Sequence, residues 1–78
     1  MSEIEVFMKE LTKVFRNVLS DLYCINWSET DGSDVKKILR AAFTRWKNHK
    51  PEIEKMFEQT TELNKFQKTM VISLLLAI

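Results

Sequence analysis

Apolar side chains recur at helical intervals through the first 25 residues of the chain. Alternating steps of four and three residues separate Ile4, Met8, Leu11, Phe15, Val18, Leu22 and Ile25. This spacing averages 3.5 residues, so all seven lie on one side of an α-helix. Phe7, Val14 and Leu19 widen that side enough to contact two neighbouring helices. With Ser2 as a suitable N-cap, the pattern predicts a helix over about residues 2–25.

A second helical pattern follows a polar segment. Residues 26–34 (NWSETDGSD) have the composition of a loop, and Ser33 is expected to cap the next helix. Beyond it, apolar residues recur at the spacing of a single helical stripe: Val35, Ile38, Leu39, Ala42, Phe43 and Trp46. The pattern predicts an amphipathic helix over about residues 34–48.

The last third of the chain allows two interpretations. Pro51 suits the first position of a helix, and apolar residues then keep one helical phase to Ile78. The adjacent β-branched residues Thr60 and Thr61 weaken a continuous helix, and a threonine can cap a new one. We therefore favour helices over about residues 51–59 and 61–78, with one continuous helix as the alternative.

The final nine residues, MVISLLLAI, change the pattern because their apolar side chains surround the helix. A helix that is apolar on all sides has to be buried on all sides. This predicts either a central helix or a surface shared with another chain, and we expect a homodimer. The residues expected to contribute to self-association are Ile4, Met8, Leu11, Phe15, Val71, Ile72, Leu75 and Leu76.

Length and composition support an all-α fold in one domain over residues 1–78, a small self-associating bundle of three or four helices. A chain of 78 residues buries only about 60% of its unfolded surface. One cysteine, Cys24, cannot form a disulfide within the chain, and with His49 it cannot complete a structural zinc site. Helix packing and self-association are left to stabilise the fold.

No membrane or export signal is expected. The N-terminal MSEIEVF carries acids where a signal peptide carries basic residues. The apolar run at residues 70–78 is much shorter than the roughly 20 residues that cross a bilayer. We expect a cytoplasmic protein that does not contact membranes.

Charge is unevenly distributed, although the whole chain carries only +1. Residues 35–50 contain six Lys or Arg and no acid, whereas residues 1–34 contain three basic and seven acidic side chains. In a helix, the side opposite the apolar stripe would present Lys36, Lys37, Arg40, Thr44 and Lys47, with Arg45 on its flank.

A solvated helix face is the simplest interpretation of these charges, and acidic segments could pair with it across the bundle. Basic residues near residue 47 also suit a helix C-terminus, but Lys36 and Lys37 lie in the first turn, where the helix dipole disfavours them. We therefore predict a non-enzymatic adaptor, inhibitor or regulatory subunit that binds an acidic protein partner. The predicted contact residues are Lys36, Lys37, Arg40, Thr44, Arg45, Lys47, Trp27 and Trp46.

Nucleic-acid binding through the same residues is the alternative function. Nine residues separate the two helical patterns, where a helix-turn-helix has three or four. Acids in that loop would repel phosphate, which counts against nucleic-acid binding. Within this alternative, the basic residues are expected to contact the phosphate backbone without base recognition. A third interpretation is a protein whose only function is assembly with its own copies.

Catalytic and metal-binding patterns are not expected. A single glycine excludes a nucleophile elbow and a phosphate-binding loop. Cys24 and His49 could meet as nucleophile and base, but a small buried cysteine and a helix-terminal histidine explain them more simply. Aligning Gly32 with the invariant glycine of a calcium loop puts Trp27 and Ile38 at ligand positions, where neither can bind calcium. No enzyme activity, cofactor or metal is predicted.

Overall fold

The computed structural model describes residues 2–78 and shows an all-α bundle, which confirms the predicted fold class. Four α-helices and one 3-10 helix make up the described chain, with no strand. Their bounds are Glu3–Tyr23 (α1), Ser33–Phe43 (α2), Thr44–His49 (the 3-10 helix η1), Lys50–Gln59 (α3) and Lys65–Ala77 (α4).

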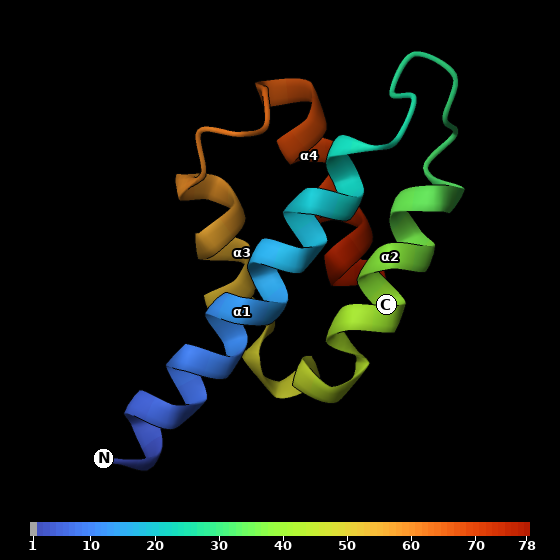
Figure 1. Cartoon of the computed structure of the whole chain (residues 1–78). Helices are drawn as coiled ribbons and strands as arrows, with labels where there is room; N and C mark the ends of the chain where they lie inside the picture. Colours follow the sequence, from blue (N-terminus) through green and yellow to red (C-terminus); the bar gives the residue numbers. More distant parts are fainter. Residues whose placement is uncertain (1) are drawn as a thin grey trace.

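The four α-helices alternate in direction along the chain (Figure 1). Helix α2 packs between α1 and α4, and α4 packs against α3. Helices α1 and α3 meet through Phe15 and Phe57, whose ring centroids lie 4.8 Å apart. The bundle therefore closes in the order α1, α2, α4, α3.

Each α-helix contributes apolar side chains to a single core. Phe57 is completely buried in this core. Its ring packs against Phe15 and also lies edge-on to the ring of Phe43, with centroids 6.1 Å apart. The buried residues are Leu11, Phe15, Val18, Leu19, Leu22, Val35, Leu39, Phe43, Trp46, Ile53, Phe57, Leu63, Val71 and Leu75. No buried side-chain nitrogen or oxygen atom among the described residues lacks a hydrogen-bond partner. No polar or charged residue among those described is buried, so the core consists of apolar side chains.

Helix α1 begins as expected but ends before residue 25. The hydroxyl of Ser2 accepts a hydrogen bond from the Glu5 N–H at 3.2 Å. At the other end, the N–H of Ile25 donates to the Leu22 carbonyl, which tightens the backbone beyond α1 into a turn. Ile25 stays partly buried against the core although it lies outside the helix.

The predicted cap of α2 is wrong by one residue. Gly32 occupies the N-cap position with φ +96°, a left-handed conformation that glycine adopts at little cost. A Cβ atom at this position would lie 3.4 Å from Leu74 Cδ1, so α4 approaches the cap closely. Ser33 is the first helical residue, and its N–H donates to Asp31 Oδ1 at 3.0 Å.

Helix α2 also ends earlier than its apolar pattern predicted. The α-helix stops at Phe43, and η1 continues the chain to His49 with Trp46 in a non-helical conformation (φ −111°, ψ 25°). This kink turns the chain towards α3 while Trp46 remains buried. The apolar spacing of α2 therefore extends to Trp46 although the α-helix does not. The Trp46 side chain reaches the core from the kinked backbone of η1.

The C-terminal segment forms two helices, but the fourth begins later than predicted. Residues 60–64 separate α3 from α4, and the cap is Asn64, not a threonine. Asn64 Oδ1 accepts from the Gln67 N–H, and Gln67 Oε1 accepts from the Asn64 N–H, both at 2.9 Å. This reciprocal capping box fixes the start of α4.

Helix α4 is not a central helix of the bundle, which was the first of the two predicted alternatives; a surface shared with another chain stays a prediction. Val71 and Leu75 are buried, whereas Leu76 is 54% exposed, because neighbours cover only one side of the helix. Of the residues predicted for self-association, Leu11, Phe15, Val71 and Leu75 pack inside a single chain and are not accessible to a second copy. Ile4, Met8, Ile72 and Leu76 keep exposed surface. No helix within residues 2–78 is long and apolar enough to cross a membrane.

Candidate functional site

The outward side of α2 carries a cluster of basic residues. Since Val35, Leu39 and Phe43 point into the core, Lys37 and Arg40 are exposed and Lys36 is half-buried. Thr44, the first residue of η1, lies one helical turn after Arg40 and extends this side. Lys47 lies further along η1, where the α-helical spacing no longer applies. The basic face is defined here as Lys36, Lys37, Arg40 and Thr44; Arg45 and Lys47 are exposed on η1.

The positive charges of this face have no acidic partner within the described chain. Across residues 2–78, the one acid–base contact within 4.0 Å joins His49 Nδ1 to Glu52. The acidic segments that could have paired across the bundle therefore do not neutralise Lys36, Lys37 or Arg40. The charges remain available to an external group.

Two polar side chains in or near the basic face, Thr44 and Lys50, already donate hydrogen bonds within the chain. The Thr44 hydroxyl donates to the Arg40 carbonyl oxygen, so it has no proton left for a partner. Lys50 Nζ donates to the Ile78 carbonyl oxygen and links α3 to the end of α4. Lys50, the last of the six basic residues in this segment, is consequently separate from the face.

A shallow apolar cleft borders the basic face between α1 and α2. Its volume is about 420 Å³, and its lining consists of Asp21, Lys37, Ile38, Ala41 and Ala42. Lys37 belongs both to this cleft and to the basic face. A ligand here could combine charge contacts with apolar burial, the usual composition of a protein–protein interface.

Trp46 is a core residue, and its predicted role as a surface anchor is wrong. Only 7% of its surface is exposed, and its ring lies 5.2 Å from that of Phe7. The guanidinium carbon of Arg45 lies 5.8 Å from the Trp46 ring centroid. Trp46 therefore offers Arg45 a cation–π contact but little surface for a partner.

Trp27 is not brought to the basic face. Its Nε1–H donates to the Leu22 carbonyl at 3.1 Å, which fixes the half-buried ring against the end of α1. The cleft around it, about 250 Å³, is lined by α1, the 60–64 segment and α4, with no residue of α2. A partner that covers the basic face does not reach Trp27 through this cleft.

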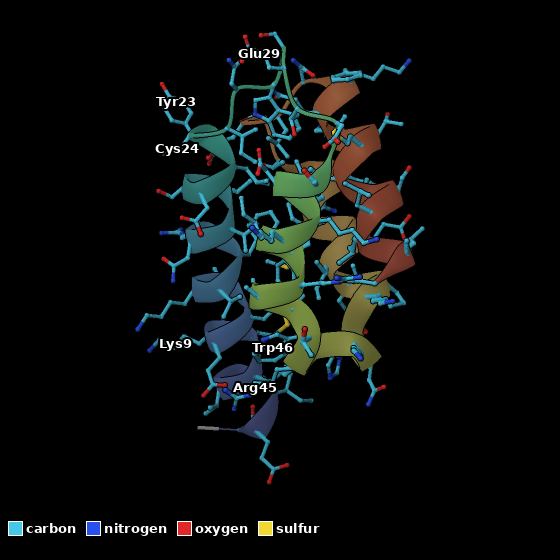
Figure 2. The ribbon with its side chains drawn as sticks, turned by 90° about the vertical axis from the view of Figure 1, so that its right-hand side faces the viewer. Lys9, Tyr23, Cys24, Glu29, Arg45 and Trp46 are labelled. Carbon is cyan, nitrogen blue, oxygen red and sulfur yellow. The ribbon has the colours of Figure 1, made fainter. Side chains whose placement is uncertain are left out.

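The structure adds an aromatic cluster that sequence reasoning missed. Phe7 lies between Trp46 and His49, with ring centroids 5.2 and 4.3 Å away. They border an open cleft of about 440 Å³, which is also lined by Glu3, Val6, Glu10 and Arg45. Figure 2 shows Arg45 and Trp46 beside the N-terminal half of α1. Phe7 and His49 are 42 residues apart, and no local pattern connects them.

The arrangement does not provide a cysteine–histidine catalytic pair. Cys24 follows the C-terminal end of α1, whereas His49 stacks on Phe7 near its N-terminal end. The 17 residues from Phe7 to Cys24 correspond to about 26 Å along a helix. Cys24 is also exposed, contrary to the prediction that it is buried.

The acidic loop stabilises the start of α2. A hydrogen bond from the Ser33 backbone N–H lowers the pKa of the Asp31 carboxyl group, because the bond favours the charged form.

No group of three or more His, Cys, Asp or Glu side chains in the described residues could hold a metal ion.

Comparisons with protein-family models, with curated proteins and with solved structures found no match to this chain. The basic face and the adjoining apolar cleft share Lys37 and form one continuous site on α2.

Proposed function

We propose that this chain is a non-enzymatic protein–protein interaction module, acting as an adaptor, inhibitor or regulatory subunit. The basic face binds an acidic surface of a protein partner, and the cleft lined by Ile38, Ala41 and Ala42 receives an apolar side chain of that partner. The observation that supports this most strongly is that the described chain leaves Lys36, Lys37 and Arg40 without an acidic neighbour within 4.0 Å.

Each part of the site has a different role in binding. Unpaired charges at a surface accelerate encounter with an oppositely charged partner and set its orientation. Exposed ion pairs contribute little affinity by themselves, typically below about 1 kcal/mol each. Burial of Ala41 and the accessible part of Ile38 therefore supplies the additional affinity.

Nucleic-acid binding remains the alternative for the same basic face, since lysine and arginine also contact phosphates. Asp21 in the adjoining cleft and Asp34 in the first turn of α2 reduce the attraction of this surface for a polyanion. Salt separates the two functions. Phosphate contacts weaken steeply and log-linearly with salt, whereas a protein complex with apolar contacts is less sensitive.

The test begins with capture of the partner from the native host by the wild-type chain, with and without nuclease. The identified protein is then purified and its affinity measured for wild type and for Lys37→Glu/Arg40→Glu. A matched control, Lys55→Glu/Lys65→Glu, reverses two exposed charges on α3 and α4. We expect loss of binding only for the basic-face variant. Undiminished binding by that variant would show that the proposed face is wrong.

A further inference from the structure

The N-terminal end of α1 extends beyond the helices that cover the rest of it. Helix α1 has 21 residues and α3 only 10, about 31 and 15 Å in length. Figure 1 shows the first turns of α1 projecting from the bundle. This N-terminal arm, residues 3–10, exposes Ile4 (75%), Val6 (44%) and Met8 (43%).

Two exposed residues of the N-terminal arm, Ile4 and Met8, continue the apolar side that α1 uses inside the bundle. Ile4 and Met8 precede Leu11 and Phe15 in the alternating spacing of four and three. Leu11 is completely buried and Phe15 is packed against Phe57, whereas Ile4 is 75% exposed and Met8 is 43% exposed. Phe7 packs the arm against Trp46 and His49 of η1, whereas the side that carries Ile4 and Met8 keeps exposed apolar surface.

Charges beside this apolar side are arranged for an antiparallel copy of the same arm. Glu5 and Lys9 lie on one flank of α1, and both are exposed without an acid–base contact within 4.0 Å among residues 2–78. Lys9 points away from the bundle (Figure 2). When two arms run antiparallel, the Glu5 end of each lies beside the Lys9 turn of the other.

We propose that a second copy of this chain binds the N-terminal arm, with the two arms packed antiparallel about a two-fold axis that passes midway between Ile4 and Met8. Ile4 of each copy packs against Met8 of the other, and Glu5 of each approaches Lys9 of the other. Such a contact is isologous and closes at two subunits. It leaves the basic face free, so the inference is independent of the proposed function.

The contact area sets the expected strength and shape of this dimer. Two helical turns provide less than the roughly 800 Å² per partner of a standard interface, so the dimer is weak. The arms lie at one end of a molecule that measures 44 × 23 × 18 Å. Joining two such ends gives an elongated particle.

The outer side of α4 is the competing surface for a second copy, because Phe66 is 61% exposed and Leu76 is 54% exposed. Helix α4 contains Lys65 and Lys68 but no Asp or Glu, so two copies of this surface lack complementary charges. The N-terminal arm has both an apolar side and complementary charges, which favours it over α4.

The first experiment compares matched apolar variants by sedimentation equilibrium from about 10 μM to about 1 mM. We expect wild type and the control Phe66→Ser/Leu76→Ser to dimerise equally, and Ile4→Ser/Met8→Ser to remain monomeric. Circular dichroism checks that each variant is folded. A wild-type monomer at the highest concentration, or a dimer lost only in the α4 control, would overturn the proposal. Small-angle scattering adds a second check: a compact dimer would contradict the arm contact.

The second experiment uses charge reversal across the dimer. Glu5→Lys and Lys9→Glu each place like charges opposite one another, so each variant alone should dimerise about tenfold more weakly. In an equal mixture, one copy of each variant restores both opposite-charge pairs, and association should return to the wild-type level. Failure of the mixture to associate better than the separate variants would refute the pairing. Since the restored pairs lie between molecules, a change within either helix cannot produce the expected result.

Discussion

Phe57 in α3 and Phe66 in α4 provide a matched test of the bundle, because they are the same residue type in two helices of the C-terminal segment. The structure separates them: Phe57 is completely buried and Phe66 is 61% exposed. Replacing a buried phenylalanine by alanine costs about 3–5 kcal/mol. Phe57 also loses ring contacts with Phe15 and Phe43, each worth about 0.5–1.5 kcal/mol beyond area burial, which places it in the upper part of that range.

This cost is large compared with the stability of so small a protein. A chain of 78 residues has an unfolding free energy of roughly 4–12 kcal/mol. We therefore expect Phe57→Ala to lose at least about a third of this free energy, and to be largely unfolded at 25 °C if the wild-type stability lies at the lower end of the range. Phe66→Ala should change the free energy of unfolding by less than about 1 kcal/mol, because the lost contacts are few and alanine favours the helix.

Urea unfolding followed by far-ultraviolet circular dichroism measures both free energies by linear extrapolation. If Phe57→Ala has no folded baseline, Phe57→Leu supplies a milder variant, expected to lose about 1–2 kcal/mol. The reasoning fails if Phe57→Ala costs no more than Phe66→Ala, since the two residues would then be equally buried. A large cost at Phe66 would instead indicate that another surface covers it, with α4 of a second copy as the first candidate.

Three local features give further predictions. Gly32→Ala should destabilise the fold by about 1–2 kcal/mol, measured by urea unfolding, because φ is +96° and Leu74 lies close to the new Cβ. Asn64→Ala should cost about 1 kcal/mol through loss of the α4 capping box, whereas Asn64→Ser should retain most of it. The folded-state pKa of Asp31 lies below its unfolded value, so its contribution to stability is present above the unfolded pKa and is lost as pH falls through the folded pKa. Carboxyl chemical shifts should show the low pKa of Asp31, and Asp31→Ala should remove this part of the acid dependence.

The periodicity of apolar residues was sufficient to predict an all-α bundle and the approximate position of most helices. It works because a helix brings every third or fourth side chain to one side, whatever covers that side. The same reasoning located Lys36, Lys37 and Arg40 on the outward side of α2, since they alternate with Val35, Leu39 and Phe43. These conclusions depend only on local geometry.

Tertiary structure decided which members of each apolar pattern are buried and which charges stay unpaired. Ile4 and Leu11 share one side of α1, yet Ile4 is 75% exposed and Leu11 is fully buried. The difference arises because the N-terminal end of α1 extends beyond the helices packed against it. Trp46 is buried through contact with Phe7, almost 40 residues away, rather than by continuation of α2. Burial depends on where neighbouring helices begin and end, and the spacing of residues within one helix contains no record of that.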